Sequence, residues 1–187
     1  MPPRFDFQPT ALAGLTVVCR KQSEDGRGSF TRMFCAEEFR KIGLAKPIAQ
    51  INHSVTRCKG VVRGLHFQYP PHAETKIVSC LKGEIFDVAV DLRADSPTFL
   101  CWHGEVLSAE NRKALCIPEG FAHGFQALED DCELLYLHTE CYTPTAESAL
   151  NVTDPRLNIA WPLPIAELSE RDHAHPFIGP DFAGVCA

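Results

Sequence analysis

The densest group of chemically active side chains lies in the segment 63–68, with the sequence RGLHFQ. Its histidine, His66, is a candidate general base, because the unperturbed pKa of imidazole lies near working pH. On a β-strand, alternation places His66 and Arg63 on opposite faces. The glycine between them, Gly64, allows another backbone or a ligand to approach closely. A histidine in such a place can also be a core residue whose hydrogen bonds are satisfied.

Other side chains that could act on a small ligand are spread along the chain. Arg27 lies between two glycines in a predicted turn, where a guanidinium either binds phosphate or is solvated. Tyr136 lies in a strand-like run, where a buried phenol commonly satisfies its hydroxyl within the core. Asp172 lies at the start of a predicted helical turn, where an exposed carboxylate is the simplest interpretation.

The eight histidines and nine cysteines form no metal-binding motif. A metal-dependent cupin normally has His-x-His with a glutamate a few residues on, and neither His66 nor His123 has such a neighbour. We therefore expect no metal ion and no cofactor. The cysteines lack C-x-x-C spacing, so we expect them to be reduced and buried as small apolar residues.

The elements that position these residues are predicted to be mostly short strands. Apolar runs rich in β-branched and aromatic residues alternate with turn signals. They predict strands at 15–18, 47–51, 60–65, 76–81, 85–92, 99–107, 114–117, 123–128 and 133–138. The pattern of residues 35–42 (CAEEFRKI) predicts a short helix ended by Gly43, and further helical turns are expected at 165–169 and 170–173.

This pattern predicts an all-β fold, a jelly roll or related double-sheet barrel with a few short helices. An α/β fold is excluded because no helices alternate with the strands. Segment 85–92 alternates with period two, and Phe86, Val88 and Val90 lie on its strongly apolar face. The other face is mixed, carrying Asp87, and would line a site or meet a partner.

Length and net charge further limit the number of domains and the classes of partner that the chain could have. At 187 residues the chain suits one domain, with a core at about 9–177 and a short C-terminal tail. A net charge of −6, from 18 basic and 24 acidic residues, argues against a nucleic-acid binder but leaves room for a small phosphorylated ligand. The sequence has no apolar run of about 18 residues and no signal-peptide pattern, so we expect a cytoplasmic protein that contacts neither membrane nor nucleic acid.

Taken together, several segments resemble the dTDP-4-dehydrorhamnose 3,5-epimerase family of nucleotide-sugar epimerases. The segments follow one another in order and cover roughly residues 9–177; they are 60–68 (GVVRGLHFQ), 83–93 (GEIFDVAVDLR), 96–99 (SPTF), 107–111 (LSAEN), 117–125 (IPEGFAHGF), 159–162 (IAWP) and 168–172 (LSERD). The resemblance implies a cofactor-independent jelly-roll enzyme of the cupin superfamily that works as a homodimer. Its substrate would be a nucleotide-linked 4-keto-6-deoxyhexose.

The resemblance also implies roles for individual residues. His66, paired with Asp172, would remove a proton next to the sugar carbonyl, and Tyr136 would return one on the opposite face. Lys76 would lie beside the carbonyl and stabilise the enolate. The residues expected to hold the nucleotide and sugar are Arg27, Gln50, Asn52, Arg63 and Tyr142. His123 is expected to lie close to the catalytic base, His66.

Two positions depart from the family pattern, and they leave the substrate open. Ser23 stands where an aromatic residue is expected, and Arg32 stands where a glutamate is expected, so a CDP-linked sugar is an alternative to a dTDP-linked one. Inversion at C3 or C5 alone is an alternative to inversion at both. Two other classes compete, a metal-dependent cupin and a non-catalytic module that binds sugar nucleotides.

Overall fold

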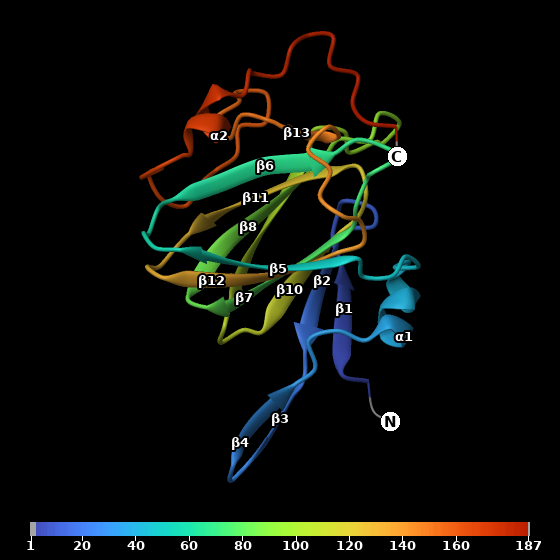
Figure 1. The fold of residues 1–187 in the computed structure, drawn as a ribbon, viewed down its shortest axis with the longest axis vertical. Helices are drawn as coiled ribbons and strands as arrows, with labels where there is room; N and C mark the ends of the chain where they lie inside the picture. Colours follow the sequence, from blue (N-terminus) through green and yellow to red (C-terminus); the bar gives the residue numbers. More distant parts are fainter. Residues whose placement is uncertain (1–2, 187) are drawn as a thin grey trace.

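Two antiparallel β-sheets face each other in the computed structural model, which describes residues 3–186 (Figure 1). The larger sheet has the strand order β1 (Phe5–Pro9), β2 (Thr16–Arg20), β10 (Lys113–Ile117), β7 (Lys76–Lys82), β12 (Cys132–His138) and β5 (Gln50–Thr56). The smaller sheet has the order β13 (Glu147–Ala149), β6 (Val62–Gln68), β11 (Phe121–Ala127), β8 (Glu84–Asp91) and β9 (Trp102–Ser108). This arrangement confirms the predicted all-β jelly roll of the cupin type.

Each predicted strand overlaps an observed one, although most ends differ by a few residues. The sequence pattern missed β1 and β13. It also missed a hairpin of β3 (Gln22–Asp25) and β4 (Gly28–Thr31), which projects from the lower end of the molecule in Figure 1. All four strands are short, and β1, β3 and β4 are largely exposed, so they carry little of the apolar alternation that marks a strand.

The helices are few and short, as expected. The predicted helix at 35–42 is α1 (Ala36–Phe39) continued by the 3₁₀ turn η1 (Arg40–Ile42), and Gly43 ends it with φ of 90°. The expected turn at 170–173 is α2 (Glu170–Ala174). The prediction at 165–169 is wrong, because Glu167 there pairs in extended form with Val61.

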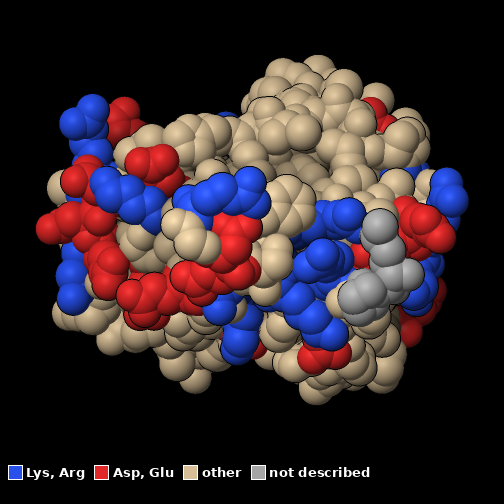
Figure 2. All heavy atoms as spheres, turned by 90° about the horizontal axis from the view of Figure 1, so that it is seen from below, with Lys and Arg blue, Asp and Glu red and all other residues tan. Residues whose placement is uncertain are grey.

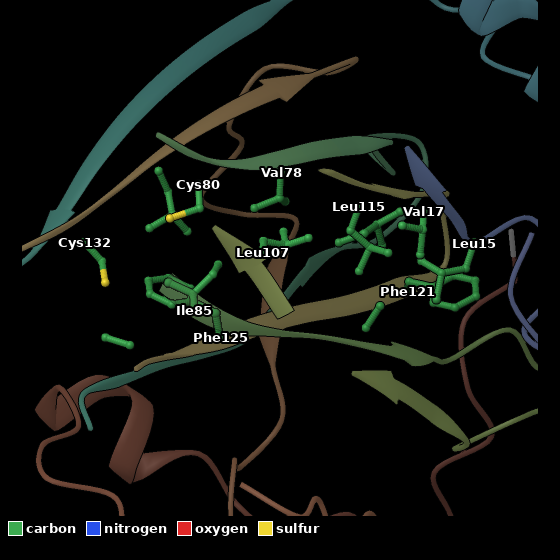
Figure 3. Close-up of a cluster of buried hydrophobic side chains, with 14 of the residues drawn as sticks. Leu15, Val17, Val78, Cys80, Ile85, Leu107, Leu115, Phe121, Phe125 and Cys132 are labelled. Atoms are coloured by element: carbon green, nitrogen blue, oxygen red, sulfur yellow. The ribbon is translucent and has the colours of Figure 1, made fainter. Parts of the chain in front are cut away.

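The main core lies between the two sheets, where their inner side chains meet (Figure 3). Val78 and Leu115 come from the larger sheet, and Ile85, Leu107 and Phe125 come from the smaller one. Every one of these side chains is at least nine-tenths buried. Removing one of them would cost roughly 2–5 kcal/mol of folding stability.

The outer face of the smaller sheet is covered by the C-terminal segment. The apolar face of β8, which includes Val88 and Val90, packs there against Leu150, Val152 and other residues of that segment. The mixed face of β8 points into the space between the sheets and carries the fully buried Asp87. The predicted difference between the two faces of this strand is therefore confirmed.

The cysteines correct one expectation. All nine are free thiols, but Cys58, Cys101, Cys141 and Cys186 are exposed rather than buried. They lie in loops between the strands or close to the C-terminal end, where neither sheet covers them.

Seen from below, Asp and Glu gather on the left of the view with some Lys and Arg among them, and a group of Lys and Arg lies right of the centre (Figure 2). Within residues 3–186, no helix has the length and apolar character needed to cross a membrane.

Candidate active site

A cavity of about 290 Å³ opens between the sheets beside the main core. Strands β5, β7 and β12 of the larger sheet form one wall, and β6 and β11 of the smaller sheet form the opposite wall. Nearly all of its lining residues carry a polar group, and they include many of the residues singled out from the sequence. The lining residues are Asn52, Ser54, Arg63, His66, Glu74, Lys76, His123, Phe125, Tyr136, His138, Tyr142 and Glu147.

An irregularity in β6 places both Arg63 and His66 on this cavity, which corrects the predicted alternation. In the pairing of β6 with β11, His66 lies opposite His123 but Arg63 lies opposite Phe125, so β6 has one extra residue between the two pairs. Such a β-bulge shifts the alternation of side chains by one. It occurs at Gly64, where an added Cβ would lie 2.5 Å from Cα of Gly124. The expected close backbone approach at Gly64 is therefore confirmed.

His66 and Asp172 form a hydrogen-bonded pair at one side of the cavity. Nε2 of His66 lies 2.8 Å from Oδ1 of Asp172, and the Asp172 side chain is only 6% exposed. Ser169 caps α2 by accepting the Asp172 backbone N–H, which fixes the carboxylate behind the imidazole. Burial opposes ionisation of Asp172, but the hydrogen bond and charge of His66 outweigh it and lower the pKa of Asp172. Asp172 is therefore a partnered buried group and not the exposed carboxylate that its local sequence suggested.

A second imidazole–carboxylate pair lies deeper in the cavity. Nε2 of His123 lies 2.7 Å from Oδ1 of Asp87, and both side chains are buried. Burial raises the pKa of Asp87, although attraction to His123 partly offsets this effect. The ring of His123 is in edge contact with the ring of Tyr136, with 6.0 Å between ring centroids. Burial raises the pKa of Tyr136 above its ordinary value of about 10, so the phenol stays protonated at neutral pH.

Lys76 is held between the two walls of the cavity. Its ammonium donates a hydrogen bond to the backbone oxygen of His66 at 3.1 Å and forms an ion pair with Glu74 at 3.2 Å. The other oxygen of Glu74 lies 2.7 Å from Nδ1 of His138. Burial opposes ionisation of Glu74, but His138 and Lys76 together lower its pKa. The carboxylate thus orients the ammonium and keeps it within reach of a bound molecule.

The remaining predicted residues fall into two groups. Gln50, Asn52 and Tyr142 lie together at the mouth of the cavity, where the Gln50 side chain bonds both Asn52 and the backbone of Tyr142. Arg27 lies elsewhere, at the tip of the β3–β4 hairpin, with its guanidinium 90% exposed and 2.7 Å from Asp25. Ser23 also lies on this hairpin and not on the cavity.

Sequence reasoning missed several lining residues, above all Glu74, His138 and Ser54, and it named no partner for the buried Asp87. Glu74 precedes Lys76 by two residues in a segment with no strand or motif signal, so its partner His138 could not be inferred. Asp87 did carry a signal, because it is a carboxylate on the inner face of an otherwise apolar strand. A buried carboxylate of this kind requires a partner, and His123 provides it.

The arrangement can do acid–base chemistry on a small bound molecule. A carboxylate-backed histidine can accept a proton, a protonated phenol can donate one, and an ammonium on the same cavity can stabilise a developing oxyanion. On a cupin-type barrel, these groups define an epimerase that moves protons on a carbon next to a carbonyl.

The chain belongs to the dTDP-4-dehydrorhamnose 3,5-epimerase family, whose model matches residues 9–179. It is 43% identical to the dTDP-4-dehydrorhamnose 3,5-epimerase of Salmonella typhimurium, over 90% of this chain and 93% of that protein. It is 40% identical to the dTDP-4-dehydrorhamnose 3-epimerase of Streptomyces niveus, over 89% of this chain and 80% of that protein.

Solved structures of epimerases also resemble this chain in fold. The epimerase of Bacillus anthracis with TDP and pyrophosphate bound matches with a TM-score of 0.90 and 36% identity, over 93% of this chain and 99% of that chain. The Legionella pneumophila enzyme in complex with dTDP-4-keto-L-rhamnose matches with a TM-score of 0.88 and 39% identity, over 92% of each chain. A 3′-monoepimerase from Streptomyces bikiniensis, in complex with dTDP-quinovose, matches with a TM-score of 0.83 and 34% identity, over 91% of this chain and 86% of that chain.

Proposed function

We propose that this protein epimerises dTDP-4-dehydro-6-deoxyglucose at C3 and C5, forming dTDP-4-dehydro-L-rhamnose. The observation that carries the proposal is a single cavity lined by His66, Lys76 and Tyr136, with Asp172 hydrogen-bonded to His66. Three of the five similar proteins named above are 3,5-epimerases of dTDP-linked sugars, which supports a dTDP-sugar as substrate and inversion at both carbons.

His66 is the proposed base. Its Nε2–H donates to Asp172, which leaves the lone pair of Nδ1 free to accept the proton from C3 or C5. The electron pair of the broken C–H bond moves into the carbonyl and gives an enolate. Asp172 stabilises the imidazolium that forms and holds the ring in the productive tautomer.

Lys76 is the proposed partner of the enolate oxygen. A hydrogen next to a carbonyl is removed at neutral pH only if the developing negative charge is stabilised, and one such donor is typically worth about 3–4 kcal/mol of barrier. The ammonium sits in a largely buried place, where its charge acts more strongly than in water.

Tyr136 is the proposed acid on the opposite face of the sugar. It lies on β12 in the larger sheet, whereas His66 lies on β6 in the smaller sheet, so a sugar between the sheets meets them from two sides. Donation of the phenolic proton to the enolate carbon completes the inversion. Because burial raises the pKa of Tyr136, the resulting phenolate takes a proton back readily, which resets the site for the second carbon.

The nucleotide part is assigned to the mouth of the cavity. Arg63, with Gln50, Asn52 and Tyr142, offers a guanidinium and several hydrogen-bonding groups to the diphosphate and sugar. Arg27 lies on the β3–β4 hairpin, away from the cavity of its own chain. Its predicted role therefore requires that the hairpin reach the cavity of a second copy of the chain.

We further propose that the chain works as a single domain, as a homodimer, and in the cytoplasm. Ile51 and Val55 are exposed on β5, the edge strand of the larger sheet, and Phe30 is exposed on the hairpin, so apolar surface is available for a second copy. Nine free thiols fit a reducing compartment.

Deuterium incorporation tests the proposed function. The purified protein is incubated in D2O with dTDP- or CDP-4-keto-6-deoxyglucose, and the sugar is analysed by mass spectrometry. Two deuterons in the dTDP-sugar are expected, and no deuteron in either sugar would refute the proposal in favour of a non-catalytic binding module. A single deuteron would establish a C3- or C5-monoepimerase, the alternative that the Streptomyces relatives favour.

A further inference from the structure

Behind the catalytic pair lies a third side chain that the epimerisation does not use. One ligand atom from each of His66, Asp172 and His175 lies within 4.8 Å of the other two. Nε2 of His175 is buried and has no hydrogen-bond partner in the described part of the chain. A buried imidazole nitrogen without a partner is costly, which suggests that it serves a ligand.

We propose that His66, Asp172 and His175 bind a divalent transition-metal ion of the Zn²⁺ type, and that this ion inhibits the enzyme. Two imidazoles and one carboxylate form a donor set that suits Zn²⁺ and its neighbours, whereas Mg²⁺ and Ca²⁺ prefer oxygen ligands. Donor atoms in a tetrahedral zinc site lie about 3.4 Å apart, given bonds of about 2.0–2.1 Å. The three donor atoms lie within 4.8 Å of one another, so metal binding would require only side-chain adjustments to reach that spacing.

The local structure prepares this site. Asp172 and His175 lie on the same short helix and its C-terminal end, where Ser169 caps the start of α2 and Asn151 donates to the backbone oxygen of His175. His66 faces them from β6. The three donors therefore come from two elements that are already packed together.

A second hollow of about 240 Å³ gives an ion access to the catalytic pair, because His66 and Asp172 both line it together with Glu167. Arg63 lines this hollow as well as the main cavity, and its guanidinium bonds Thr56 and the backbone of Val55. Arg171 also lines this hollow, but its guanidinium is paired with Glu147 rather than with Asp172. An ion in this hollow lies directly against His66 and Asp172.

Inhibition follows from the tautomer of His66, and this part of the inference rests on the proposed function. Metal binding through Nε2 needs the lone pair of that nitrogen, so the proton of the neutral ring moves to Nδ1. Nδ1 then has no lone pair for the proton of the sugar. Binding also takes Asp172 away from its role as partner of the imidazolium.

The test combines metal binding with catalysis. Zn²⁺ is titrated by calorimetry, and Co²⁺ binding is followed by its visible absorption, in the wild-type protein and in His175→Gln. We expect one Zn²⁺ per chain in the wild type and binding at least about tenfold weaker in the variant, since even partners outside the ligand shell are worth about 10- to 100-fold. His173→Gln is the matched control, because His173 is exposed on the same helix, and it should bind like the wild type.

Activity gives the second readout. Deuterium exchange by the wild type should fall on addition of Zn²⁺ and return with EDTA, while His175→Gln should keep its exchange at the same Zn²⁺ concentration. Equal Zn²⁺ binding by wild type and His175→Gln, or no binding by the wild type, would overturn the inference. Absence of exchange in EDTA with either sugar would instead refute the proposed function, while calorimetry would still decide the metal site.

Discussion

Replacing Asp172 by Asn tests how much the buried carboxylate contributes to proton transfer. The variant keeps the size of the side chain and removes its charge. Nε2 of His66 and Oδ1 of Asp172 are 2.8 Å apart, so their charge centres lie about 4 Å apart and attract by about 4 kcal/mol at an effective dielectric constant of about 20. With half of the imidazolium charge developed in the transition state, the loss is about 2 kcal/mol, or about 30-fold in rate.

The hydrogen bonds around Asp172 increase the expected loss of rate in the Asn variant. The backbone N–H of Gly64 faces Oδ2 of Asp172 at 3.4 Å. An asparagine that keeps its oxygen toward Gly64 presents its NH2 group to His66, which favours the tautomer with the proton on Nδ1. We therefore expect kcat/KM to fall by a factor between about 30, from charge alone, and about 10⁴, the cost of a wrong tautomer in a comparable pair.

The assay is deuterium exchange at C3 and C5 under single-turnover conditions, together with dTDP affinity measured by calorimetry. Affinity should stay close to that of the wild type, because Asp172 does not line the main cavity. Ser169→Ala is the control, since it removes the helix cap and leaves the charge in place, and its exchange rate should fall much less. An exchange rate for Asp172→Asn within threefold of the wild type would refute the reasoning.

Three further changes probe the other groups of the cavity. Lys76→Met should lower kcat by about 10²- to 10³-fold with little change in dTDP affinity, as measured by steady-state kinetics and calorimetry; an unchanged kcat would exclude Lys76 from enolate stabilisation. Tyr136→Phe should retain exchange at the first carbon but lose inverted product in NMR spectra, and equal loss of both would contradict its role as the acid. Glu74→Gln should lower the melting temperature at about pH 7 more than at about pH 3, because a carboxylate with a lowered pKa stabilises the native state above its ordinary pKa and loses this effect as pH falls. A melting-temperature difference that does not change with pH would show that the charge of Glu74 contributes nothing.

Much of the fold could be predicted from the sequence, because strands that face a core on one side carry apolar residues at alternate positions. Strands such as β8 and β12 have this pattern, and both were found close to their predicted ends. The hairpin of β3 and β4 lacks it, since both strands are exposed and neither faces a core. The predicted turn at Arg27 is confirmed, but it covers only the tip of this hairpin.

The site was harder to predict because its groups come from strands distant in sequence. The family resemblance pointed to four catalytic residues, His66, Lys76, Tyr136 and Asp172. In the structure the first three line one cavity, and Asp172 is hydrogen-bonded to His66 behind it. Local sequence gave no means of pairing Glu74 with His138, which lie 64 residues apart. Such pairs depend on the register between strands, and register follows from the whole sheet.

The bulge at Gly64 has a consequence for how this cavity can evolve. In a regular strand, odd-numbered and even-numbered residues face opposite sides of the sheet. A cavity on one side is therefore lined only by every second residue. The bulge in β6 shifts this alternation by one residue, so Arg63 and His66 line the same cavity although one is at an odd and the other at an even position. Deleting one residue at this point would restore the regular count and turn one of the two side chains away from the cavity. The number of residues in this strand is therefore as important to the cavity as their identity.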